Sequence, residues 1–224
     1  FGTESPYIFT FTRQGRMHPD VAHFAVKSFY EDNLSPVPLP HQLTPLHFPV
    51  VDAGCPLQQI MATRRTVFFP SSAPVDNLSP KTNVREARMI ARTVQSVYSL
   101  YRQNRKPFLP HESVGVIVPY RLQIVQVMQE IASLGIPELN GITVDTVERY
   151  QGSQRDVIIY GFTVRQPYQL QFLCSQSFVE QGTVIDRKLN VALTRAREQL
   201  VLIGNPAILS LDEVHRRLIE EIEA

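Results

Sequence analysis

The sequence lacks the features of several protein classes. Its 224 residues contain no tryptophan and only two cysteines, Cys55 and Cys174, which do not stand in a metal-binding spacing. We find no signal peptide and no apolar run long enough to cross a membrane, so we expect no membrane partner. The two isolated cysteines and six scattered histidines predict a reduced, cytoplasmic protein without a disulfide framework and without a metal site.

The sequence also lacks an excess of charge of either sign. Lys and Arg number 22 against 21 Asp and Glu, which gives a net charge of +1. A basic groove for nucleic acid would therefore have to be local. The 43% hydrophobic content is enough for a full core, and the length suits one large domain. Because the first residue is Phe1, we expect a piece of a longer chain.

The most informative stretch is a helical pattern that runs into a buried strand. Four apolar residues recur at helical spacing: Leu189, Ala192, Leu193 and Ala196. The apolar run 200–203 then has the length of a strand. On a helix, Arg195 and Arg197 would project to opposite sides of the apolar stripe, so only one could point into a given cleft. A fixed arginine there would suit phosphate, and the alternative is a pair of surface ion pairs.

Two stretches nearer the N-terminus predict a junction and a loop. Residues 7–12 alternate and predict a strand, and Pro19 opens a predicted helix. Arg16 would then lie at a strand-to-helix junction, where α/β folds place ligands. Residues 35–49 hold five prolines and predict an extended surface loop, with a proline-rich ligand for another domain as the alternative.

The middle of the chain predicts further strands and helices. Asn83 and Glu86 form a predicted capping box for a helix that reaches about residue 102. Strands are predicted at 66–69, 114–118, 141–145 and 157–163, and a final amphipathic helix covers 207–224. Residues 164–185 are polar and without a clear period, which predicts an irregular connection.

Three of these stretches resemble motifs of superfamily 1 helicases, in the group that contains the nonsense-mediated-decay RNA helicase and flap-processing DNA helicase-nucleases. LNVALTRAREQLVLIGN at 189–205 resembles motif VI. QGRMHP at 14–19 resembles motif IV, and the segment 146–156 around Gln151 and Gly152 resembles motif V. The motifs occur in family order across nearly the whole chain.

The resemblance implies roles for individual residues. Arg195 matches the arginine finger and Arg16 the arginine that contacts the terminal phosphate, so both are catalytic candidates. The ATP-binding candidates are Gln14, Gln151, Gly152 and Gln154. The nucleic-acid-binding candidates are Thr146, Pro119 and Tyr120, although Tyr120 could equally be a core tyrosine. Two positions depart from the family: Gly15 replaces a tyrosine that stacks on adenine, and Gln154 replaces a glutamate that faces the sugar.

The expected fold is α/β, a RecA-like three-layer fold of the P-loop NTPase type with a mostly parallel sheet, over residues 1–224 as one domain. Neither a Gly-x-x-x-x-Gly-Lys-Ser/Thr loop nor a Walker B acidic pair occurs in the 224 residues. The resemblance therefore implies the second RecA-like domain of a helicase that uses ATP and Mg²⁺, with the Mg²⁺ ligands on an N-terminal RecA-like domain of the same protein.

The other implied partner is a single-stranded nucleic acid, and the resemblance favours DNA and a 5′ to 3′ direction. We expect this chain alone to be inactive. The alternative is a RecA-like module that holds nucleic acid or a protein without turnover. The presence of both Arg16 and Arg195 disfavours that alternative, because a pure binding module has no need of an arginine finger.

Overall fold

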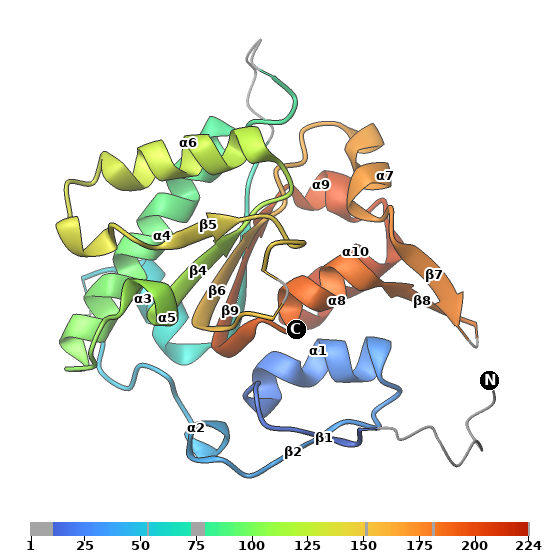
Figure 1. The fold of residues 1–224 in the computed structure, drawn as a ribbon, viewed down its shortest axis with the longest axis horizontal. Coiled ribbons are helices and arrows are strands. Elements are labelled where there is room, and N and C mark those ends of the chain that lie inside the picture. Colours follow the sequence, from blue (N-terminus) through green and yellow to red (C-terminus); the bar gives the residue numbers. More distant parts are fainter. Residues whose placement is uncertain (1–10, 53, 73–78, 151, 181, 224) are drawn as a thin grey trace.

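A parallel β-sheet forms the centre of the computed structural model, which describes residues 11–52, 54–72, 79–150, 152–180 and 182–223 (Figure 1). The sheet has five strands in the order β3-β9-β6-β4-β5, and every pairing in it is parallel. Its strands are β3 (Thr66–Pro70), β4 (Val114–Ile117), β5 (Thr143–Asp145), β6 (Arg155–Gly161) and β9 (Ala196–Gly204).

Helices cover both faces of this sheet, and successive residues of one strand enter different cores. In β6, Ile158 and Tyr160 pack with α1 (Pro19–Phe29), α8 (Arg187–Leu193) and α10 (Glu213–Glu223). Val157 and Ile159 pack on the other face with α3 (Pro56–Thr63), α4 (Val84–Gln103) and α6 (Arg121–Ala132). This alternation follows from the two-residue period of a strand.

The predicted α/β architecture with a mostly parallel sheet between two helical layers is confirmed. The remaining helices are short: α2 (Pro40–Leu43), α5 (Pro110–Ser113), α7 (Leu170–Leu173) and α9 (Pro206–Leu209). None of the described helices combines the length and apolar character needed to cross a membrane.

The predicted helix around residues 189–196 ends earlier than its apolar spacing indicated. Helix α8 stops at Leu193, and Ala196 is already the first residue of β9. The Arg155 amide donates to the Arg195 carbonyl at 3.1 Å, so pairing with β6 takes over directly after Thr194. Tertiary pairing has overridden the helical pattern, and the helical angle between Arg195 and Arg197 does not apply.

The N-terminal strand and the proline-rich loop were predicted incompletely. Residues 7–10 lie outside the described residues, and residues 11 and 12 are not in a strand. Instead β1 (Arg13–Gln14) pairs in parallel with β2 (Ser35–Pro36), apart from the central sheet. The segment 35–49 thus contributes β2 and the short helix α2, whose first residue is a proline that needs no amide hydrogen there.

The segment 164–185, predicted to be irregular, has defined structure. It contains a 3₁₀ turn (Pro167–Gln169), α7, and an antiparallel hairpin of β7 (Ser177–Glu180) and β8 (Thr183–Asp186). Residue 181, between the two strands, lies outside the described residues. The hairpin leads directly into α8, because Asp186 caps that helix by accepting from the Leu189 amide at 3.0 Å.

The predicted capping box at the start of α4 is half correct. The Asn83 side chain accepts from the Glu86 amide at 3.0 Å, but the Asn83 amide donates to Gln123 at 2.7 Å. The fully buried Glu86 carboxyl instead accepts from the Thr163 amide at 2.6 Å and from the Ser71 hydroxyl at 3.3 Å. Glu86 therefore ties α4 to the residues that follow β6.

Burial raises the pKa of Glu86 to about 8 from an ordinary value of 4.5, against its hydrogen bonds from Thr163 and Ser71. The folded protein then binds a proton here that the unfolded chain has lost. Stability should therefore fall as the pH rises from about 4.5 to about 8, by up to about 1.4 kcal/mol per pH unit.

Glu86→Gln keeps an acceptor for the Thr163 amide but cannot titrate. Chemical unfolding of both proteins across this pH range should show a flatter dependence for the variant. Identical slopes would contradict the assignment of a raised pKa to Glu86.

Candidate functional site

The candidate residues gather at two opposite edges of the sheet. Arg16, Gln154 and Arg195 lie at the amino ends of β6 and β9, since Gln154 directly precedes β6 and Arg195 directly precedes β9. Pro119, Tyr120 and Thr146 follow the carboxyl ends of β4 and β5. The expectation that Arg16 lies at a strand-to-helix junction is confirmed, since β1 ends at Gln14 and α1 begins at Pro19. Strand β1 is not part of the central sheet, however, and Arg16 lies at the amino edge of that sheet, opposite to the edge where α/β folds usually bind ligands.

Side-chain amides fix the turn that presents Arg16. The Gln14 side-chain oxygen accepts from the amides of Arg16 at 2.9 Å and Met17 at 2.8 Å. Gln42, in α2, donates to the carbonyls of Gln14 at 3.1 Å and Met17 at 2.8 Å, and a His41 ring nitrogen lies 2.9 Å from the Arg16 carbonyl oxygen. The proline-rich segment therefore holds the turn in place. The Gln14 side chain is used for hydrogen bonds inside this turn.

The Arg16 guanidinium reaches the amino edge of the sheet. Its Nε donates to Gln154 Oε1 at 3.2 Å and its Nη1 to the Thr194 carbonyl at 3.1 Å. Arg195 lies beside it, with its Nε donating to the Val191 carbonyl at 3.2 Å and its Nη1 to the Ser153 carbonyl at 3.4 Å. The structure thus brings together Arg16, Gln154 and Arg195, which are far apart in the sequence.

The two guanidiniums create a positive site. Burial lowers the pKa of Arg195, and the neighbouring Arg16 charge lowers it further, which shows that the two cations oppose each other. Among the described residues, no carboxylate forms an ion pair with either arginine. Two half-buried arginines without a counter-charge form a site for an anion, and their forked donors suit phosphate oxygens.

Arg197 differs from Arg195 in its environment. It lies within β9, and its Nη1 donates to Asp156 Oδ1 at 3.0 Å in an ion pair. Its charge is therefore already compensated. That only one of the two arginines serves a given cleft stays a prediction. It now rests on the ion pair of Arg197 with Asp156 and no longer on helical geometry.

The segment between β5 and β6 connects the two edges. It begins with Thr146 at the carboxyl edge and ends with Gln154 at the amino edge. Gly152 has a φ of +83°, a conformation that favours glycine, and a Cβ added there would meet nothing within 4 Å. This open backbone lies beside Ser153, whose carbonyl receives Arg195. Gln151, an ATP-binding candidate, lies outside the described residues.

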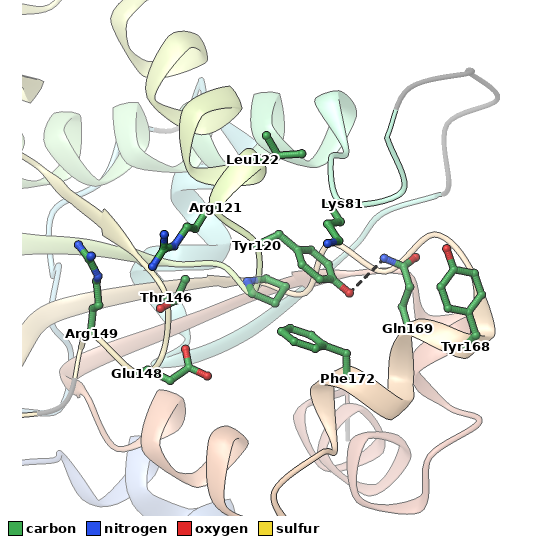
Figure 2. Close-up of a pocket in the computed structure, with 11 residues that line it drawn as sticks. Lys81, Tyr120, Arg121, Leu122, Thr146, Glu148, Arg149, Tyr168, Gln169 and Phe172 are labelled. Atoms are coloured by element: carbon green, nitrogen blue, oxygen red, sulfur yellow. Dashed lines mark hydrogen bonds between the residues drawn. The ribbon is translucent and has the colours of Figure 1, made fainter.

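A cavity of about 810 Å³ opens at the carboxyl edge (Figure 2). The three nucleic-acid-binding candidates, Pro119, Tyr120 and Thr146, all line it. The other lining residues are three cations, three further polar or charged residues and two apolar ones: Lys81, Arg121, Arg149, Glu148, Tyr168, Gln169, Leu122 and Phe172. Basic side chains interleaved with aromatic rings are typical of surfaces that bind single strands.

Part of this cavity comes from the segment that the sequence left unassigned. The Phe172 ring stacks on Tyr120 with centroids 5.1 Å apart, and Lys188 Nζ lies 4.3 Å from the Phe172 ring centroid. Gln169 donates to the Tyr120 hydroxyl at 3.3 Å (Figure 2) and to the Pro80 carbonyl at 2.8 Å. In the sequence, the four-residue spacing of Tyr168 and Phe172 could have indicated two aromatic side chains on the same side of a helical turn.

The interpretation of Tyr120 as a core tyrosine agrees with its burial, and its contact with nucleic acid stays a prediction. The residue is only 8% exposed, and burial raises the pKa of its hydroxyl. It nevertheless lines the cavity, where Tyr168 at 59% exposure is the most accessible aromatic ring.

Gly15 does not have the left-handed backbone that would require glycine. A Cβ added there would lie 3.2 Å from a methyl group of Leu39, which belongs to the proline-rich segment and is 38% exposed. An aliphatic side chain thus borders the position where the resemblance leads one to expect a tyrosine.

Comparison with known proteins gives consistent matches. A family model described as an AAA domain matches residues 4–207. Helicase sen1 of Schizosaccharomyces pombe is 27% identical over 215 residues, covering 93% of this chain and 11% of the relative. ATP-dependent helicase upf1 of the same organism is 30% identical, covering 88% of this chain and 20% of the relative.

A regulator of nonsense transcripts 1 homolog from Arabidopsis thaliana is 31% identical over 205 residues, covering 88% of this chain and 14% of the relative. This chain therefore spans between a tenth and a fifth of the length of these relatives.

Proposed function

The chain belongs to the AAA-domain family of superfamily 1 helicases, and we propose that it forms the half of an ATP-driven nucleic-acid motor that supplies the arginine finger. The observation that supports this most is the pair of uncompensated arginines, Arg16 and Arg195, at the amino edge of the sheet. A module that only binds nucleic acid does not need such a pair.

In this proposal Arg195 and Arg16 act on the terminal phosphate. ATP, bound with Mg²⁺, supplies the phosphoanhydride bond whose hydrolysis drives the motor. Arg195 and Arg16 orient the phosphate oxygens and stabilise the charge that develops on them. Their hydrogen bonds to the Val191, Ser153 and Thr194 carbonyls hold the guanidiniums before the anion arrives. Little reorganisation is then needed during the reaction.

Neighbouring residues complete the ATP-binding half-site. We propose that Gly152 offers its backbone to a phosphate and that Gln154 faces the sugar. Gln151, which directly precedes Gly152 in the sequence, is proposed to contact ATP as well. Gln14 acts by holding the Arg16 turn. The phosphate loop and the Mg²⁺ ligands would lie on an N-terminal RecA-like domain of the same protein, and the much greater length of the relatives leaves room for one.

The cavity at the opposite edge is proposed to lie on the path of a single strand. Thr146, Pro119 and Tyr120 would contact the backbone and sugars, while Lys81, Arg121 and Arg149 would attract phosphates. We propose DNA as the strand and 5′ to 3′ as the direction, on the resemblance to flap-processing helicases. The relatives do not decide this, since the one from Arabidopsis thaliana is described as a regulator of nonsense transcripts 1 homolog.

The segment 146–154 gives a physical route between the two halves of the function. One end lines the cavity through Thr146, and the other end contacts Arg16 and Arg195 through Gln154 and Ser153. Buried Tyr150 fixes its middle by donating to the Thr143 carbonyl at 2.7 Å. A movement of Gln154 or Ser153 caused by the nucleotide would then be transmitted to Thr146 and to the nucleic acid in the cavity.

Arg195→Ala in the intact protein should reduce ATP turnover by at least about 10³-fold, because a finger acts mainly in the transition state. ATP affinity should change by only a few-fold. The matched control is Arg197→Ala, which removes an arginine two residues away that is already paired with Asp156. Steady-state phosphate release and nucleotide titration measure both quantities, and equal losses in turnover from the two variants would contradict this assignment.

The 224-residue chain alone should not hydrolyse ATP, because it contains no phosphate loop. Phosphate release by a preparation free of other ATPases should equal the buffer blank. Arg195→Ala made in the same chain is the control: activity above the blank that disappears in this variant would overturn the division of the site between two domains.

Arg121→Gln in the intact protein should weaken single-strand binding and lower the dependence of log K on log salt by roughly one unit. Arg121 lines the cavity, whereas Arg88 lies on the exposed side of α4 near Glu130, so Arg88→Gln is the control. Fluorescence anisotropy with oligo-dT and oligo-rU measures the effect and compares DNA with RNA. Equal salt slopes in wild type and Arg121→Gln would contradict the proposal that the single strand binds along this cavity.

A further inference from the structure

Three metal-ligating side chains converge at a place that belongs to neither candidate site. Cys174 follows α7, Asp186 precedes α8, and His215 lies in the first turn of α10. The thiol sulfur, a carboxylate oxygen and a ring nitrogen of these residues all lie within 4.8 Å of one another. Asp186 is 2% exposed, His215 is 1% exposed and Cys174 is half-buried. None of them lines the cavity at the carboxyl edge.

Two of the three groups are already held in place. His215 Nδ1 lies 2.7 Å from Asp212 Oδ1, and the His215 amide donates to the same oxygen at 3.0 Å. A carboxylate that accepts from an imidazole nitrogen is the usual partner of a metal-bound histidine. Asp186 Oδ1 accepts from the Leu189 amide at 3.0 Å, which fixes the second ligand.

The chemistry of the three groups suits a divalent cation. One thiol sulfur, one imidazole nitrogen and one carboxylate oxygen from three separate segments converge within 4.8 Å. Asp186 and His215 are buried, so the place is largely shielded from water. A divalent cation bound there would lower the pKa of a coordinated thiol enough to deprotonate it.

We propose that Cys174, Asp186 and His215 bind one zinc ion. Sulfur, imidazole nitrogen and carboxylate oxygen are the ligands that zinc takes in proteins, at about 2.0–2.3 Å. Tetrahedral ligands at those lengths lie about 3.3–3.8 Å apart, so side-chain movements of about 1 Å would close the cluster. Water completes the coordination. Binding replaces the thiol proton by the S–Zn bond and releases that proton to solvent.

A zinc ion here would join three elements that carry the proposed motor. It would tie the end of α7, which carries the cavity residue Phe172, to the start of α8, which leads to Arg195. It would also tie both to α10. The role is structural, since no residue of the cluster contacts Arg16, Arg195 or the cavity candidates through a hydrogen bond within the described part of the chain.

Metal content of matched variants tests the proposal. The intact protein, Cys174→Ser and His215→Gln are produced with added zinc, dialysed without chelator and measured by inductively coupled plasma mass spectrometry. Cys55→Ser is the control, because Cys55 is the other half-buried free cysteine and lies before α3. Wild type and Cys55→Ser should carry about one equivalent more zinc than the other two variants. Equal zinc in all four proteins would overturn the proposal.

A second measurement needs only the wild-type protein, in case a variant fails to fold. After removal of zinc, added Co²⁺ should produce the charge-transfer absorption of a thiolate–cobalt bond and release a proton, and zinc should abolish the absorption. Zinc should also raise the thermal midpoint, since binding to the folded state stabilises it. A wild-type protein that shows neither the absorption nor a zinc-dependent midpoint would overturn the proposal even if the variants lose metal through misfolding.

Discussion

The parallel pairing of β6 with β9 is the interaction on which the arrangement of the site depends. Parallel strands start at the same edge, so the residues before β6 and the residues before β9 must lie next to each other. The bond from the Arg155 amide to the Arg195 carbonyl closes that edge. Arg16 then adds a contact to each side, through Gln154 and the Thr194 carbonyl. The positive site is thus a consequence of strand register.

The opposite edge is built by a different kind of contact. There the sheet supplies the ends of β4 and β5, and buried side chains such as Gln169 tie the remaining wall to them. Gln169 is 3% exposed, accepts from the Arg165 and Gln166 amides at 2.8 and 2.9 Å, and donates to Pro80 and Tyr120. Side-chain hydrogen bonds between distant segments take the place of a further strand.

The sequence was informative where structure is local and poor where it is not. The apolar runs at 114–118 and 200–203 predicted buried strands, and both are confirmed as β4 and β9. The end of α8 was missed because pairing with β6, which no local pattern records, competes with the helix after Leu193. The fold of 164–185 was missed for the same reason, since Gln169 finds its partners at Pro80 and Tyr120. The link between Arg16 and Arg195 came from the family resemblance, because no spacing rule relates residues so far apart.

The segment between β5 and β6 has a consequence for how such a chain can vary. Its two ends are fixed at opposite edges of the sheet, and Tyr150 anchors its middle so closely that a Cβ at Gly115 would overlap the tyrosine hydroxyl. Between Thr146 and Tyr150 the backbone is closed by the bond from the Tyr150 amide to the Thr146 carbonyl at 3.1 Å. An insertion or deletion there would displace either the tyrosine from Gly115 or Thr146 from the cavity. Surface loops in general tolerate changes of length over evolutionary time, whereas residues 146–150 are expected to keep theirs.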